Sequence, residues 1–171
     1  SSGVFVLRVT NITPSGVICK DKAVFLPSEK VTREVERFYL NEGDILLVMV
    51  GGSLGKIGLV TSDILPALLN QNLWRITPGN DEVDSQFLRL IIDFAVSFQR
   101  KTTHSTHGHL SREEFRKKPV AFPPLPEQQR IVAKVDELMA LCDELEMRLT
   151  ASATARRQLL EATLQEALER R

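Results

Sequence analysis

The chain has 171 residues, which is enough for one domain with a hydrophobic core and an extension beyond it. Its 22 basic and 22 acidic residues balance, which counts against a protein that coats DNA non-specifically but not against a local basic patch. Two cysteines, Cys19 and Cys142, are too few for a disulfide framework, and no segment has the apolar length needed to span a membrane. We therefore expect a cytoplasmic protein.

The first 122 residues are expected to mix short strands and helices. Helices are predicted at residues 32–39 and 86–99, the second capped by Asp84 or Ser85, with a short helix starting at Ser111. The apolar run Ile45–Val50 does not alternate with polar residues, so it indicates a strand buried on both faces. The other expected strands lie at residues 4–9, 17–19, within 53–60, and at 73–76 and 120–122.

The glycine-rich segment Gly51–Lys56 separates two apolar runs. A nucleotide-binding phosphate loop has four residues between its outer glycines and Ser or Thr after the lysine. This segment encloses three residues between Gly51 and Gly55, and Ile57 follows the lysine, so we predict the tip of a tight β-hairpin instead. Ser53 and Lys56 on that tip are candidates for contacting a DNA phosphate.

The apolar face of the predicted helix at residues 86–99 follows from its repeat. The residues at helical spacing are Phe87, Leu90, Ile91, Phe94 and Phe98.

All three histidines of the chain fall in residues 101–109, a polar stretch without an apolar side chain. A zinc site needs about four ligands and no cysteine is close by in sequence, so we expect no metal. Basic flanks attract phosphates, and Thr, Ser and His supply donors and acceptors for base edges, whereas the structural alternative is a mobile polar loop. The candidates for DNA contact here are Arg100, Lys101, Thr103, His104, Ser105, Thr106, His107 and His109.

The amide run Asn70-Gln71-Asn72 precedes the strand predicted at residues 73–76. Amide side chains can read adenine bidentately, and they can equally satisfy the backbone of a turn, so both interpretations stay open. The sequence has no nucleophile motif with a nearby histidine, no carboxylate pair with clear spacing and no glycine-rich cofactor fingerprint. We therefore expect a non-catalytic chain that binds no cofactor of its own.

A rigid proline run at residues 122–126 precedes a long helix predicted from Glu127. Apolar residues there recur with the 4-3-4 spacing of a coiled-coil seam and resume after a stutter. The seam residues are Ile131, Val135, Leu138, Cys142, Leu145, Leu149, Leu160 and Leu164. About 40 helical residues give an arm of roughly 60 Å, and one helix cannot bury its own apolar stripe, so a partner helix is expected.

One further pattern is distributed over nearly the whole chain. Its segments are Val4–Ile12, Leu40–Leu47, Gly52-Ser53 with Gly55-Lys56, Asn70–Leu73, Gly108–Ser111 and Pro123–Val132. Together they resemble the specificity subunits of type I restriction–modification systems. The stretch Pro123–Val132 is similar to the boundary motif of that family, and the other segments are similar to its target recognition domain.

This resemblance implies a DNA-reading protein that catalyses nothing itself. In the family, a full specificity subunit carries two target recognition domains, each followed by a conserved helix, and the antiparallel helices fix the spacing between two DNA half-sites. Modification subunits methylate adenine with S-adenosylmethionine, and restriction subunits cut DNA. This chain holds one recognition domain and one helix, so it corresponds to a fragment or to a half-length subunit.

We therefore expect an α+β fold in which residues 1–122 form a DNA-binding domain, residues 123–126 a proline connector and residues 127–171 a coiled-coil helix. The expected function is recognition of one half of a bipartite site in double-stranded DNA. The expected protein partners are modification and restriction subunits and a second copy or second half of the specificity subunit. The alternative is a protein-interaction adaptor with a coiled-coil arm and no DNA role. No motif encodes the target bases.

Overall fold

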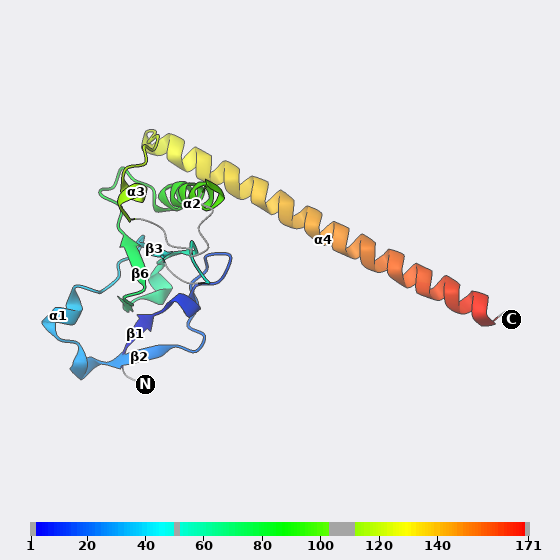
Figure 1. Cartoon of the computed structure of the whole chain (residues 1–171), viewed down its shortest axis with the longest axis horizontal. Helices are drawn as coiled ribbons and strands as arrows, with labels where there is room; N and C mark the ends of the chain where they lie inside the picture. Colours follow the sequence, from blue (N-terminus) through cyan, green and yellow to red (C-terminus); the bar gives the residue numbers. More distant parts are fainter. Residues whose placement is uncertain (1–2, 50–51, 103–111, 170–171) are drawn as a thin grey trace. The chain divides into compact units, whose positions relative to one another are not determined.

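The computed structural model describes residues 3–49, 52–102 and 112–169 and confirms the predicted α+β class (Figure 1). The chain divides into two compact units, the globular unit Ser1–Gln129 and the helical unit Arg130–Arg171. Every described strand lies in the globular unit, and the described part of the helical unit is one continuous helix. No helix within the described residues is both long and apolar enough to cross a membrane.

The first sheet of the globular unit has three strands in the order β2-β1-β5. The strands are β1 (Gly3–Leu7), β2 (Val24–Pro27) and β5 (Ala67–Leu69). β1 pairs antiparallel with β2 and parallel with β5. The strand predicted at residues 4–9 is confirmed but ends at Leu7, because Val9–Asn11 forms a 3-10 helix. The buried Asn11 side chain holds that turn by accepting the Arg8 N–H at 3.0 Å.

The strand predicted at residues 17–19 is wrong. Ile18 makes only an isolated bridge with Ile12, because turns bend the chain on both sides of it. Gly16 and Lys22, which flank the segment, have positive φ angles of 84° and 52°. The edge strand β2 and the short strand β5 were not expected from the sequence, since both are too short for a clear alternation.

The second sheet has the order β4-β3-β6, with both neighbours antiparallel to the central strand. Its strands are β3 (Ile45–Val48), β4 (Ile57–Leu59) and β6 (Leu73–Ile76). The predicted hairpin between β3 and β4 is confirmed. All four side chains of β3 are buried, which confirms a strand covered on both faces.

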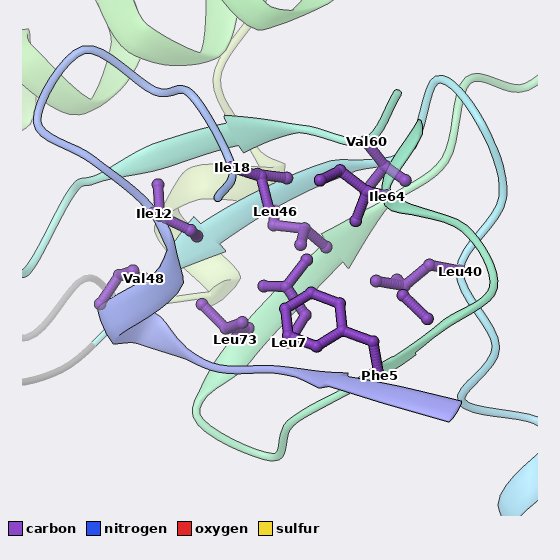
Figure 2. Close-up of a cluster of buried hydrophobic side chains, with 11 residues drawn as sticks. Phe5, Leu7, Ile12, Ile18, Leu40, Leu46, Val48, Val60, Ile64 and Leu73 are labelled. Carbon is purple, nitrogen blue, oxygen red and sulfur yellow. The ribbon is translucent and has the colours of Figure 1, made fainter. Parts of the chain in front are cut away.

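β3 contributes to both hydrophobic clusters of the globular unit, because successive side chains of a strand point to opposite faces. The first cluster, drawn in Figure 2, includes Phe5 and Leu7 of β1, Leu46 and Val48 of β3, and Leu73 of β6. The second cluster includes Ile45 and Leu47 of β3 and Ile92 and Val96 of α2 (Ser85–Thr102). The two sheets therefore pack around the first cluster, and α2 covers the other face of β3.

The remaining helices of the globular unit are short. α1 (Arg33–Glu36) occupies only the middle of the helix predicted at residues 32–39, because Tyr39 forms a β-bridge with Leu68. α3 spans Arg112–Arg116, and the predicted capping residue Ser111 lies outside the described residues. Single 3-10 turns also occur at Ser28–Lys30 and Ser62–Ile64.

α2 begins as predicted, and its buried face overlaps the predicted one only in part, with Leu90 and Ile91 half-buried. The Asp84 carboxylate accepts the Phe87 N–H at 2.8 Å, so Asp84 is the capping residue. Phe87 is buried as predicted, together with Ile92 and Val96, whereas Phe94 is 72% exposed. The sequence of α2 has apolar residues on more than one side of the helix, so the spacing alone is compatible with two buried faces. Packing against β3 decides which of them is buried. The side chain of Phe98 lies outside what the structure describes.

The segment predicted as a last strand at residues 120–122 has no regular secondary structure. Pro119 and Pro123 flank it and have no N–H group to donate to a ladder. The segment packs against α2 instead, where the Phe122 ring meets Phe87 edge-on with 5.6 Å between ring centroids.

The long helix α4 (Leu125–Glu169) starts two residues earlier than the predicted Glu127. The Pro124 carbonyl accepts the N–H groups of Glu127 at 2.9 Å and of Gln128 at 3.1 Å. Pro126 thus lies in the first turn, where its missing N–H removes no helical hydrogen bond.

Gln128 fastens this first turn to the rest of the globular unit, and its side chain is only 1% exposed. Its Oε1 accepts the Asp84 N–H at 2.9 Å. Its Nε2 donates to the Glu82 and Pro123 carbonyls, both at 2.9 Å. One buried amide therefore connects the cap of α2, the proline segment and the start of α4.

Candidate nucleic-acid interface

The tip of the β3–β4 hairpin holds the first two predicted contact residues, Ser53 and Lys56, both half-buried. The Gly55 N–H donates to the Val48 carbonyl at 2.8 Å, and the Val48 N–H donates to the Lys56 carbonyl at 2.9 Å. Gly55 has a φ of 81°, a conformation that favours glycine. These bonds continue the ladder to the base of the tip and fix the backbone that carries Lys56.

Lys56 lines a polar cleft of about 280 Å³ in the globular unit. Three segments that are distant in sequence form its walls: residues 14–16 of the turn between the bridge partners Ile12 and Ile18, residues 54–57 of the hairpin, and α2. α2 contributes Arg89 and Asp93. Sequence reasoning missed both residues, because a cation and an anion four positions apart on a helix usually form an ordinary surface pair.

The turn at residues 13–16 is tied by its own hydrogen bonds. The Gly16 N–H donates to the Thr13 carbonyl at 3.0 Å, and the Val17 N–H donates to Thr13 Oγ1 at 3.0 Å. A Cβ atom at Gly16 would stand 2.7 Å from the Ile57 carbonyl oxygen and 3.3 Å from a guanidinium nitrogen of Arg89. Only glycine therefore allows this turn to approach the hairpin and Arg89 so closely.

The amide run Asn70–Asn72 forms the turn between β5 and β6. Asn70 Oδ1 accepts the Asn72 N–H at 3.2 Å, which is the turn-forming role that the sequence left open. Gln71 and Asn72 are exposed, and none of the three residues lines the cleft beside Lys56. Their contact with DNA stays a prediction.

The histidine-rich candidates are only partly within the described chain. Arg100 and Lys101 belong to the last turn of α2, and their side chains lie outside what the structure describes. Thr103, His104, Ser105, Thr106, His107 and His109 lie outside the described residues. Among the residues that are described, no group of three His, Cys, Asp or Glu side chains could hold a metal ion.

A second cleft, of about 490 Å³, lies between α2 and the segment at residues 118–121. Its lining is almost entirely apolar and includes the exposed Phe94 of α2 together with Pro119 and Val120. Lys118 closes one side by donating to the Ala95 carbonyl at 3.3 Å. Lys118 is the single charged residue among the described residues that line this cleft.

The helical unit exposes the predicted seam. Ile131 and Val135 are half-buried, Cys142 is exposed, and most of the leucines are at least half exposed. The exposed apolar residues of α4 are Leu138, Met139, Leu141, Leu145, Met147, Leu149, Leu159, Leu160, Leu164 and Leu168. Exposed charged pairs such as Lys134–Glu137 and Arg157–Glu161 each contribute only about 0.3–0.5 kcal/mol to the stability of the helix.

A family of proteins described as the type I restriction modification DNA specificity domain matches residues 22–155. The match covers well over half of the 171 residues and runs from the first sheet into α4.

Two curated relatives come from Escherichia coli. The chain is 35% identical over 91 residues to the type I restriction enzyme EcoAI specificity subunit, covering 51% of this chain and 15% of that protein. It is 22% identical over 150 residues to the EcoEI specificity subunit, covering 84% of this chain and 25% of that protein. The chain thus spans a quarter or less of the length of these relatives.

Two solved structures share the fold. The HsdS subunit from Thermoanaerobacter tengcongensis matches with a TM-score of 0.68 and 23% identity, covering 94% of this chain and 41% of that one. A structure concerned with complex assembly and conformational transition of the type I R-M system matches with a TM-score of 0.69 and 21% identity, with the same coverage.

Proposed function

The chain belongs to the family of type I restriction–modification DNA specificity domains, and from this premise we propose that its globular unit recognises a sequence in double-stranded DNA. The family match over residues 22–155 is the observation that carries the proposal. The cleft beside Lys56 adds physical support, because Lys56 and Arg89 line it together and neither forms a salt bridge with a described residue.

The globular unit reads one half of a bipartite DNA site in this proposal. Cations such as Lys56 and Lys101 would contact phosphates and set the position of the unit on the duplex. Polar side chains of residues 103–109 and of Asn70–Asn72 would contact base edges in the major groove. The methylated base itself would be flipped into a partner enzyme and not into this chain.

The chain supplies no catalysis and binds no cofactor of its own in this proposal. Methylation with S-adenosylmethionine and DNA cleavage would belong to modification and restriction subunits in the cytoplasm. The proposed domain division places the recognition domain at residues 1–122, the connector at 123–126 and the pairing helix at 127–171. The exposed apolar stripe of α4 supports a role in which it docks these subunits and pairs antiparallel with a second specificity helix.

A DNA titration at several salt concentrations tests the proposed function. Each phosphate contact makes the logarithm of the association constant fall with the logarithm of salt concentration with a slope of about −0.9. We expect a steep negative slope for the full chain on duplex DNA, and tighter binding to sequences enriched from a random library than to the unselected library. A chain without salt-dependent DNA binding would support the adaptor alternative.

A further inference from the structure

The cleft beside Lys56 has the chemistry of a small anion site. It is lined by two cations, Lys56 and Arg89, and one carboxylate, Asp93, which gives a net charge of +1. Its volume of 280 Å³ is several times the roughly 30 Å³ that one water molecule occupies, so it has room for an anionic group. Arginine and lysine are the residues that most often bind phosphate.

Hydrogen bonds fix the backbone of the turn and of the hairpin that form two walls of the cleft. The turn at residues 13–16 is closed by hydrogen bonds to Thr13, and Lys56 is carried by a hairpin whose tip is bonded to Val48. Arg89 lies on α2, and its Nε donates to Gln86 at 3.3 Å. A site whose backbone is fixed in this way costs little conformational entropy to occupy.

A phosphodiester fits this cleft better than a base does. Phosphates project from the surface of a duplex and can enter a concave site, whereas paired bases present only flat edges inside a groove. Because Gly16 has no side chain, the turn packs directly against the Ile57 carbonyl and beside the Arg89 guanidinium, which brings the three walls of the cleft together. The Asp93 carboxylate would repel a phosphate there and weaken its binding.

We propose that this cleft binds one phosphodiester of the DNA backbone, with the Lys56 ammonium and the Arg89 guanidinium as its two cationic contacts. The proposal rests on the proposed function and deepens it by assigning a sequence-independent positioning contact. It also brings in Arg89 and Asp93, which lie outside the motifs of the sequence.

The test uses the full chain and a short duplex of mixed sequence, titrated over a range of potassium chloride concentrations. The variants are Lys56→Gln, Arg89→Gln, the double variant and Asp93→Asn, with Lys30→Gln as the matched control, because Lys30 is exposed and does not line the cleft. Arg89→Lys retains the charge and serves as a second control. Circular dichroism melts establish that each variant is folded.

We expect Lys56→Gln and Arg89→Gln each to weaken binding about tenfold at low salt on every sequence. Because both cations hold one phosphate, the double variant should lose a total of about 0.9 from the salt slope. Asp93→Asn should bind more tightly than the parent chain, Arg89→Lys should retain most of the affinity, and Lys30→Gln should leave it unchanged.

Each contrary result has one meaning. A double variant that keeps the parental slope overturns the cleft assignment and leaves DNA recognition intact, whereas a loss of about 1.8 overturns the single-phosphate assignment. A parent chain without salt-dependent binding overturns the proposed function itself. Inorganic phosphate alone is the last probe. The proposal fails if phosphate raises the melting temperature of the parent chain but not of the double variant, while Lys56→Gln and Arg89→Gln leave DNA affinity unchanged. The cleft would then bind a free phosphate.

Discussion

Gln128 shows how much one side chain contributes when both ends of its amide are hydrogen-bonded. Its amide oxygen meets a donor and its amide nitrogen meets two acceptors, all inside the globular unit. Removing a partner from buried groups like these costs about 1–3 kcal/mol for each group left unsatisfied. The geometry therefore requires an amide and no other group of that size.

Gln128→Glu is expected to lower the free energy of unfolding by about 3 kcal/mol or more, since a carboxylate would face the Glu82 and Pro123 carbonyls without a proton to donate. Urea denaturation measures the difference. Gln129→Glu is the matched control, because Gln129 is the exposed neighbour in the same turn and its variant should unfold like the parent. Equal stability of the two variants would refute the role given to the Gln128 amide.

At the scale of single elements, β3 is the strand on which both clusters depend. Its four residues are fully buried, and they alternate between the cluster shared with β1 and the cluster shared with α2. A strand with this arrangement couples the first sheet to α2, so the two halves of the core are expected to unfold together.

Leu46→Ala and Leu47→Ala are each expected to destabilise the globular unit by about 2–5 kcal/mol, because each leaves a cavity in a different cluster. Both should still unfold in one transition when followed by tryptophan fluorescence and by circular dichroism. Val24→Ala on the exposed edge of β2 is the control and should change little. Two separated transitions in either variant would show that β3 does not couple the clusters.

α4 is the second element with a testable property of its own. Its 45 residues extend roughly 67 Å, and helices in proteins gain most of their stability from packing of an apolar face. The stripe that contains Leu138, Leu145 and Leu149 has no cover among the described residues.

Replacing Leu138, Leu145 and Leu149 together by Glu should abolish pairing of two copies, which light scattering at high protein concentration detects as a change from dimer to monomer. Met147→Glu is the control, since Met147 is exposed on α4 but lies outside the seam. A parent chain that remains monomeric at high concentration would contradict pairing through this stripe.

At the scale of the whole molecule, the sequence predicted the α+β class, the doubly buried strand, its hairpin and the long helix. Each of these has a strong local signal: an unbroken apolar run, a glycine-rich tip or a sustained apolar repeat. The prediction failed where long-range pairing decides the outcome. β5 and the parallel pairing with β1 exist only because distant segments meet, and the strand predicted at residues 120–122 has prolines where a ladder needs donors.

The candidate site divides in the same way. Lys56 could be predicted because it lies in a glycine-rich motif of the sequence. Arg89 and Asp93 could not, because their significance comes only from the contact of α2 with the hairpin and with the turn at Gly16. A site whose residues come from three separate segments has no characteristic spacing in the sequence, so it cannot be recognised as a motif.

The hydrogen bonds of Gln128 have a consequence for how the segments on either side of this residue can be exchanged. A new N-terminal segment joined before residue 128 is compatible with an existing α4 only if the Gln128 amide of that helix still meets the backbone of residues 82–84 and of Pro123. A recombination junction inside α4, beyond Gln129, keeps Gln128 and its hydrogen-bond partners in the same parent sequence. A junction at the prolines separates them, so chimeras joined there should fold less stably than chimeras joined in the helix.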